Sequence, residues 1–362
     1  MNSQSTVAAE SSELAQRGRS VRIEKLVKTY GHTNAVDGVD LDIHAGELLT
    51  LLGASGSGKT TLLSMIAGFT SPTSGTVTVA GTDITRTPPH QRDIGMVFQQ
   101  YSLFPHMNVL VNVEFPLKQR RVPRAERRRR AMQALEVVEL SHKADARPSE
   151  LSGGQQQRIA LARALVFSPN VLLMDEPFGA LDRALRERMQ SEVRRIHRDL
   201  GVTIVFVTHD QQEALTMSDR IAVFDRGNIE QIGTPEELYE SPATMHVATF
   251  LGESNVLAGS AGKGVFTTKG GVRVLTGNAD DGAGRLVVRP ERIVVDAEPS
   301  ADTPAVTGTV ADVVYLGADR RIVAATADGE LVARVPANGS VLRPGDPVTL
   351  TWPPEAAKYF AD

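Results

Sequence analysis

The sequence predicts a two-part fold: an α/β domain with a mostly parallel sheet covered by helices on both faces, then a small all-β, barrel-like domain. Over 21–240, short β-rich apolar runs alternate with stretches of helical spacing, which is the pattern of strands and crossover helices. After about Ser241 the helical periodicity fades, and short β-rich pieces separated by turn-forming residues take over. A length of 362 residues suits two such domains.

The first twenty residues, MNSQSTVAAESSELAQRGRS, are polar and have no basic start followed by an apolar core. We therefore expect a disordered tail over 1–20 rather than a secretory signal. The chain has no cysteine, which excludes disulfides and thiolate metal sites. It has no run of about twenty apolar residues, so we expect no transmembrane helix. The net charge of −4 gives no reason to expect nucleic acid as a partner.

Three continuous apolar runs in the first domain predict buried strands of the parallel sheet, at Glu47–Leu52, Val171–Met174 and Thr203–Val207. Helical spacing with many charges predicts helices over Arg124–Leu140 and Arg183–Leu200. The basic cluster QRRVPRAERRRR at 119–130 lacks interleaved aromatic residues. We interpret it as the exposed face of a helix rather than a nucleic-acid patch.

The loop GASGSGKT at Gly53–Thr60 follows an apolar strand and precedes an apolar helix, and it fits the phosphate-binding pattern G-x-x-x-x-G-K-[ST]. Its glycines let backbone N–H groups turn toward phosphate oxygens at a helix start. Lys59 is expected to bind the β- and γ-phosphates, and the Thr60 hydroxyl to bind Mg²⁺. The nucleotide-contacting candidates here are Gly53, Ser55, Gly56, Ser57, Gly58, Lys59, Thr60 and Thr61.

Two adjacent carboxylates end the apolar strand in VLLMDE. Asp175 can help hold Mg²⁺, usually through water. Glu176 can orient and activate an attacking water. Such a pair alone is often only a solvated loop, but together with the phosphate loop it favours a catalytic site.

Two further polar residues end strand-like runs and belong to the same expected edge of the sheet. His209 ends TIVFVTH and could donate to the γ-phosphate, or it could be held by a local hydrogen bond alone. Gln99 ends IGMVFQ and could reach the same water or the metal. Each alone leaves the functional and the structural interpretation open.

A second glycine-hinged helix start, LSGGQ at Leu151–Gln155, predicts another anion-binding helix end at the start of a helix over Gln155–Phe167. The two glycine loops need not converge within one copy of the chain. A head-to-tail homodimer would place one ATP between the first loop of one copy and LSGGQ of the other. ATP would then close the dimer, and hydrolysis would release it.

These motifs, in this order, resemble the ATPase subunit of an ABC transporter, specifically of an importer, over Val21–Leu251. The resemblance implies a P-loop ABC ATPase domain with a mixed sheet and a helical subdomain, which hydrolyses ATP with Mg²⁺. The matching segments are GASGSGKT (Walker A), MVFQQYSLFPHM (Q-loop), LSGGQQQRIALARAL (signature), VLLMDEP (Walker B), GALD (D-loop) and VTHDQQEALTMSDRI (switch histidine). Ala54 and Gly179 replace residues that are often Pro and Ser in these motifs.

The resemblance also implies roles for individual residues. It makes Glu176 the catalytic base and His209 the γ-phosphate sensor, and it gives Gln99 the coupling to a membrane partner and a place near the metal. Tyr30 in LVKTYG takes the place of the aromatic residue that stacks on adenine. The residues expected to reach the other copy's ATP or the dimer seam are Ser152, Gly153, Gly154, Gln155 and Asp182.

The β-rich tail, taken with its linker over 241–362, resembles the accessory TOBE domain of importer ATPases through the segment VVRPERI at Val287–Ile293. The resemblance implies a homodimer, two transmembrane permease subunits and an extracytoplasmic solute-binding protein, and it places the chain at the cytoplasmic face of the inner membrane. The strand-like pieces are Gly271–Leu275, Leu286–Arg289, Ile293–Val295, Val306–Val314, Arg321–Ala325, Leu331–Val335 and Pro347–Trp352.

The transported solute is the least determined property. Segments such as HQRDIGMVFQQYSLFPHMNV and FLGESNVL most resemble the spermidine/putrescine importer group. Importers of ferric iron, sulfate, molybdate, phosphonates and sugars share most of these segments. Outside the importers, the single cassette disfavours a soluble ABC ATPase, and the presence of Glu176 and His209 disfavours a regulatory nucleotide-binding module without turnover. The β-rich tail disfavours an exporter.

Overall fold

The computed structural model describes residues 18–179, 181–275, 281–296, 303–338 and 342–362. Most of the expected N-terminal tail, 1–17, lies outside the described residues, as does Ala180 of GALD. The chain divides into two compact units, Met1–Glu237 and Leu238–Asp362.

The first unit is built on a six-stranded sheet in the order β10-β9-β3-β8-β7-β6. Strands β3, β6, β7, β8 and β9 all run parallel to their neighbours, and β10 is antiparallel to β9. Their bounds are Leu48–Gly53 (β3), Ile94–Val97 (β6), Val171–Asp175 (β7), Thr203–Thr208 (β8), Arg220–Asp225 (β9) and Asn228–Gly233 (β10). The three predicted buried strands are β3, β7 and β8.

Alternate residues of the central strands pack into two separate hydrophobic cores. In β8, Ile204 and Phe206 join one hydrophobic cluster, whereas Val205 and Val207 join the other. A strand buried on both faces is apolar at most positions, which explains the nearly unbroken apolar runs in the sequence. The predicted α/β fold with a helix-covered mixed sheet is confirmed.

A second, antiparallel sheet belongs to the first unit and was not predicted as a separate layer. Its order is β2-β1-β4-β5, with bounds Val21–Tyr30 (β1), Thr33–Ile43 (β2), Ser74–Val79 (β4) and Thr82–Asp83 (β5). Its strands alternate between buried and exposed residues, as in Val21, Ile23 and Leu26 of β1. Bulges interrupt this alternation, so it is weaker in the sequence than the apolar runs are.

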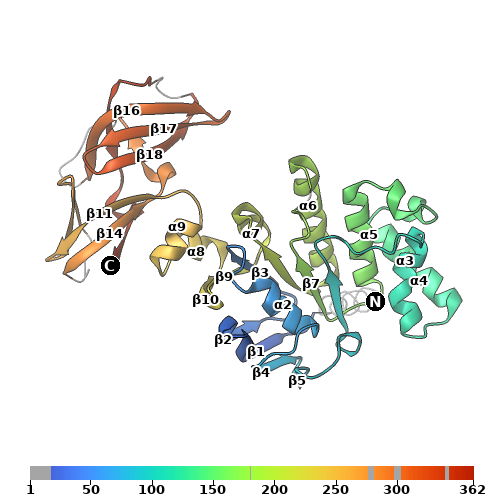
Figure 1. The fold of residues 1–362 in the computed structure, drawn as a ribbon. Coiled ribbons are helices and arrows are strands. Elements are labelled where there is room, and N and C mark those ends of the chain that lie inside the picture. The colour runs from blue at the N-terminus through green and yellow to red at the C-terminus, as the bar shows by residue number, and fades with distance from the viewer. Residues whose placement is uncertain (1–17, 180, 276–280, 297–302, 339–341) are drawn as a thin grey trace, which may run out of the picture. The chain divides into compact units, whose positions relative to one another are not determined.

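Helices α3, α4 and α5 form one group in Figure 1, which is the expected helical subdomain. Helix α4 ends at Val137, before the predicted Leu140, and α5 begins at Gly153, before the predicted Gln155. The bounds are Lys59–Ala67 (α2), Val109–Gln119 (α3), Arg124–Val137 (α4), Gly153–Leu165 (α5), Arg183–Leu200 (α6) and Gln211–Met217 (α7). Among the described residues, no helix is long and apolar enough to cross a membrane.

Much of the basic cluster at 119–130 is engaged in local contacts. Its ion pairs are Arg120–Asp93, Arg127–Glu114 and Arg129–Glu126, and Arg130 donates to the Val166 carbonyl. Three acidic partners therefore offset a run that looks strongly basic in the sequence.

Arg92 joins the end of helix α2 to the segment that leads into β6. Its guanidinium donates to the carbonyls of Met65 and Ile66, each at 2.8 Å, and to those of Thr85 at 3.0 Å and Thr87 at 2.7 Å. The side chain is buried. These bonds satisfy the Ile66 carbonyl at the end of α2 and give a second donor to the Met65 carbonyl, which also accepts from the Gly68 N–H.

We expect Arg92→Met to destabilise the first unit by about 3 kcal/mol, because it removes the guanidinium donor from the buried Ile66 carbonyl and from the part-buried Thr85 and Thr87 carbonyls. Urea unfolding followed by circular dichroism measures the loss. Arg128→Met is the matched control, since Arg128 is exposed on α4. Equal midpoints for the two variants would show that the Arg92 contacts contribute nothing to stability.

The second unit consists mainly of two five-stranded antiparallel sheets, β13-β12-β11-β14-β20 and β15-β19-β16-β17-β18. One hydrophobic core that includes Trp352 lies between them. The strands are Asn255–Gly262 (β11), Val265–Thr268 (β12), Arg273–Leu275 (β13), Gly282–Val288 (β14), Val294–Val295 (β15), Ala305–Tyr315 (β16), Asp319–Thr326 (β17), Gly329–Pro336 (β18), Pro347–Thr351 (β19) and Ala357–Ala361 (β20). The curled sheets confirm the all-β, barrel-like prediction.

Two short helices not predicted from the sequence, Pro235–Glu240 (α8) and Met245–Phe250 (α9), precede these strands. Arg289 donates to the carbonyl of Ala248 at 2.8 Å and to that of Tyr239 at 3.2 Å. The Tyr239 hydroxyl donates to Glu291, and burial together with this carboxylate raises the pKa of Tyr239 to about 12. Arg289 and Glu291 of the VVRPERI segment thus bond to Tyr239 and Ala248, which belong to the same unit as they do.

Candidate functional site

The loop between β3 and α2 has a backbone that only glycine allows at two places. Gly58 has φ 109°, and a Cβ there would lie 2.3 Å from the Ala35 carbonyl oxygen. A Cβ on Gly53 would lie 2.4 Å from the Phe224 carbonyl oxygen. Gly56 has φ 82°, with open space around it. The loop is therefore a cradle of bare backbone at the start of a helix, which fits a phosphate group.

Lys59 begins helix α2, and its ammonium group lies inside this loop. Nζ donates to the carbonyls of Gly53 at 2.8 Å and Ala54 at 2.7 Å, and to Ser57 Oγ at 3.2 Å. The residue is 4 % exposed. Burial lowers the pKa of Lys59, whereas the charges of Glu176 and Asp175 oppose that change. A phosphate in the loop would supply the negative charge that favours the ammonium form.

Thr60 and Asp175 bring two oxygen ligands together. Thr60 Oγ1 donates to Asp175 Oδ1 at 3.1 Å. Burial raises the pKa of Asp175, although the Thr60 bond opposes this, so a divalent cation there would stabilise the carboxylate. No group of three or more His, Cys, Asp or Glu gathers as a metal site in the described part of the chain. The pair fits Mg²⁺ that is also bound by phosphate oxygens.

Glu176 lies between two polar side chains that come from neighbouring strands. Gln99 follows β6 and donates from Nε2 to Glu176 Oε2 at 3.1 Å. His209 follows β8, and its Nδ1 lies 3.2 Å from Glu176 Oε1. Parallel strands end at the same edge of the sheet, so β6, β7 and β8 deliver these three residues to one point.

The Glu176 backbone is unusual for a residue with a side chain. Its φ is 42°, in the left-handed region, and its N–H donates to the Val207 carbonyl at 3.0 Å. The side chain is 23 % exposed, so its carboxylate is held in place and still meets solvent. This combination suits a group that takes a proton from water.

The LSGGQ segment begins helix α5 with a capping box. The Ser152 N–H donates to Gln155 Oε1 at 3.0 Å, and the Gln155 N–H lies 3.4 Å from Ser152 Oγ. A Cβ on Gly154 would lie 2.7 Å from Leu185, whereas one on Gly153 would meet only Leu181, at 3.8 Å. Among the described residues, no hydrogen bond joins this helix start to the phosphate loop 53–61.

The other two residues implied by resemblance lie apart from the strand-end cluster. The Tyr30 ring is 54 % exposed at the end of β1, with Lys28 Nζ 5.0 Å from its centroid. Asp182 caps helix α6 by accepting from the Leu185 N–H at 3.0 Å. Ser55 lies in the phosphate loop between Gly53 and Gly56, and Thr61 lies in the first turn of α2.

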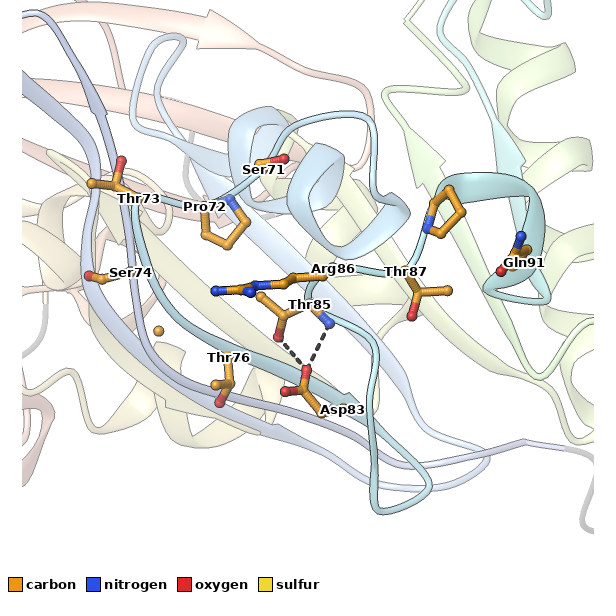
Figure 2. Close-up of a pocket in the computed structure, with 12 residues that line it drawn as sticks. Ser71, Pro72, Thr73, Ser74, Thr76, Asp83, Thr85, Arg86, Thr87 and Gln91 are labelled. Carbon is orange, nitrogen blue, oxygen red and sulfur yellow. Dashed lines mark hydrogen bonds between the residues drawn. The ribbon is translucent and has the colours of Figure 1, made fainter.

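A separate cavity of about 960 Å³ lies beside the antiparallel sheet and is shown in Figure 2. Arg86 extends along it, and Asp83 accepts from the Thr85 N–H at 2.8 Å. None of the residues predicted to bind nucleotide lines this cavity. It is therefore distinct from the strand-end site.

Comparison with known protein families decides the identity of the first unit. The family model described as "ABC transporter" matches residues 36–179, and the model described as "TOBE domain" matches residues 286–360. A relative named spermidine/putrescine import ATP-binding protein PotA, from Thermobifida fusca, is 48 % identical over 96 % of this chain and 94 % of its own length. The chain belongs to the ATP-binding subunits of ABC transporters.

Further relatives and solved structures support this family membership. A protein of the same name from Nitrosomonas eutropha is 45 % identical over 94 % of this chain and 99 % of its own length. An ATP-binding cassette solved as a dimer in a post-hydrolysis state, with ADP and Pi, is 35 % identical, with a TM-score of 0.54. It covers 59 % of this chain and 98 % of its own. The cbiO1 subunit of Clostridium perfringens is 31 % identical, with a TM-score of 0.57, over 60 % of this chain and 89 % of its own.

This ABC transporter subunit is therefore an ATPase that uses ATP together with Mg²⁺. Its second unit carries the predicted TOBE domain. The family comparison excludes the kinases and GTPases that share only the phosphate loop.

Two residues that contact the site's supporting segments were not predicted from the sequence. Arg92 holds the end of α2, and Arg163 of α5 holds the segment after Gln99. Arg92 lies in the polar stretch PPHQRD, where a buried arginine and a solvated one look the same. Arg163 is the one charged residue of the apolar run IALARALVF, so its sequence marks it as unusual but does not indicate which carbonyls it binds.

Proposed function

We propose that this chain hydrolyses ATP to drive polyamine uptake through separate permease subunits, with Glu176 as the catalytic base. The observation that carries the catalytic part is the convergence of Gln99, Glu176 and His209 at the ends of three parallel strands. The phosphate loop, Lys59, Thr60 and Asp175 come to the same sheet edge. The ATPase activity follows from membership of the family, and the roles of the individual residues are our proposal.

In the proposed reaction, Glu176 takes a proton from a water molecule as the water oxygen bonds to the γ-phosphorus. The bond from that phosphorus to the β,γ-bridging oxygen breaks, and its electron pair leaves with ADP. Gln99 and His209 hold the two carboxylate oxygens of Glu176, one each. Lys59 stabilises the phosphate charge. Thr60 and Asp175 hold Mg²⁺, which when bound neutralises charge on the phosphate oxygens.

The second half of the site is proposed to come from another copy of the chain. In one copy, Ser152–Gln155 forms a capped helix start with no hydrogen bond to the described phosphate loop. A head-to-tail homodimer would bring these N–H groups to the partner's ATP, with Asp182 at the seam. Tyr30, exposed at the end of β1, would stack on adenine.

The proposed cargo is a polyamine, spermidine or putrescine. Its support is the name of relatives up to 48 % identical over nearly the whole chain, which are spermidine/putrescine import proteins. Such an import system would contain, in addition to this chain, two transmembrane permease subunits and an extracytoplasmic solute-binding protein. The subunit would then act at the cytoplasmic face of the inner membrane, held there by the permease.

Uptake of radiolabelled spermidine and putrescine tests the cargo directly. Cells that contain the wild-type chain should accumulate the label with high affinity, and cells with Lys59→Ala should not, because Lys59 is buried in the phosphate loop. Lys118→Ala is the control, since Lys118 is exposed on α3. In cells without a second polyamine importer, absence of high-affinity uptake with the wild-type chain would exclude polyamine as the cargo, and unchanged uptake with Lys59→Ala would reject the role of Lys59.

A further inference from the structure

The turn that follows Gln99 has a backbone conformation that ordinary residues avoid. Tyr101 and Ser102 are consecutive, neither is glycine, and their φ angles are 57° and 48°. Left-handed conformations at two successive L-residues are disfavoured unless neighbouring contacts impose them. The turn has few bonds of its own: the Tyr101 N–H donates to Phe98 O at 2.9 Å, and the Ser102 N–H to Gln100 O at 2.6 Å.

Arg163 lies near the end of helix α5 and donates two hydrogen bonds to the backbone of the 100–102 turn. Nη1 donates to the Ser102 carbonyl at 2.8 Å, and Nη2 donates to the Tyr101 carbonyl at 2.9 Å. The guanidinium carbon lies 5.5 Å from the centre of the Phe104 ring. The two donors therefore bind the two strained residues themselves.

Arg163 makes these bonds without a carboxylate partner. No ion pair to it occurs among the described residues, and burial lowers its pKa. The side chain is partly buried, and taking part of a cation out of water without a carboxylate partner costs free energy that its bonds to the two carbonyls must offset. The planar fork of a guanidinium spans two adjacent carbonyls, which the single ammonium of lysine does poorly.

We propose that Arg163 is a positioning residue for ATP hydrolysis, which fixes the turn 100–102 so that Gln99 stays within reach of Glu176. The inference rests on the proposed roles of Gln99 and Glu176. Gln99 lies two residues before Tyr101, and its carboxamide donates to Glu176 Oε2 at 3.1 Å. Arg163 also belongs to the helix that begins with the LSGGQ glycines. The same contact thus ties the signature helix to the catalytic carboxylate.

Steady-state ATP hydrolysis by the full-length subunit, assembled with its permease, tests the proposal. Arg163→Met should lower kcat about tenfold and leave KM for ATP within about twofold, because the phosphate loop is untouched. Arg163→Lys should retain part of the activity. Arg130→Met is the matched control, since Arg130 also binds a backbone carbonyl in the helical group, that of Val166, and does not contact the turn. Equal kcat values for Arg163→Met and wild type would overturn the proposal.

A double-mutant cycle with Gln99→Ala separates positioning from general stability. If Arg163 acts through the turn, Arg163→Met should lower kcat little further once Gln99 is absent. Two independent, multiplying losses would overturn the inference and leave the proposed function intact. A Gln99→Ala enzyme with wild-type kcat would overturn the role of Gln99 and the inference with it.

Hydrogen exchange covers the case in which Arg163→Met folds poorly. In Arg163→Lys, peptides that contain 99–104 should exchange faster than in wild type, and the same peptides in Arg130→Met should not change. Unchanged exchange in Arg163→Lys, with kcat also unchanged, would show that the turn keeps its conformation without the guanidinium and would overturn the proposal.

Discussion

Glu176→Gln should lower the rate of ATP hydrolysis by about three orders of magnitude and leave ATP affinity nearly unchanged. Glutamine keeps the shape of the side chain and its contact distance to Gln99 and His209, but it cannot accept a proton from water. General base catalysis by one side chain is worth about 10²- to 10⁴-fold in rate. The loss should appear in kcat and not in KM.

Phosphate release by the assembled complex is the measurement for this variant. Glu187→Gln provides the control, because Glu187 pairs with Arg183 on the exposed face of α6. A Glu176→Gln enzyme that retains a tenth or more of wild-type kcat would reject Glu176 as the base. Direct binding of a fluorescent ATP analogue shows that the variant still takes up nucleotide.

Lys59→Met should remove most of the stabilisation that ATP with Mg²⁺ gives the subunit. At a nucleotide concentration of 100 Kd, binding stabilises the wild-type fold by about 2.7 kcal/mol. Loss of the lysine charge should weaken binding about 100-fold, after which the same concentration stabilises by only about 0.4 kcal/mol. The stability without nucleotide should change by about 1 kcal/mol or less, because Lys59 bonds mainly to its own loop.

Thermal unfolding with and without ATP and Mg²⁺ checks this expectation. A wild-type-sized Tm increase with nucleotide in Lys59→Met would contradict the assignment of the phosphate loop. Lys118→Met should respond to nucleotide as the wild type does, since Lys118 is exposed on α3.

The fold of the first unit was predictable where burial leaves an unambiguous pattern. Strands such as β8 are buried at every position because both faces are covered, so the apolar run predicts a strand over Thr203–Val207, and β8 spans Thr203–Thr208. The antiparallel sheet was not, because bulges break the alternation in β1. In the second unit, β11 is rich in small residues over Asn255–Gly262 and gives little hydrophobic signal.

The site residues and their common edge of the sheet were predictable, but the order of the strands that brings them into contact was not. Gln99, Glu176 and His209 end three separate apolar runs, and nothing local in the sequence states that β6, β7 and β8 are neighbours. That adjacency is what places all three within hydrogen-bonding distance. The contacts of Arg92 and Arg163 depend in the same way on the path of the chain.

The composite site, one ATP shared by two copies of the chain, is the central claim and the most directly testable. Glu176→Gln prevents turnover, so light scattering of this variant with ATP and Mg²⁺ should report a dimer, and without nucleotide a monomer. Gly153→Asp in the same background should bind ATP and stay monomeric, because a Cβ at Gly153 meets only Leu181, at 3.8 Å, while the new charge repels phosphate. An ATP-bound Glu176→Gln subunit that remains monomeric at saturating nucleotide, or a Gly153→Asp variant that dimerises as well as its parent, would contradict the claim.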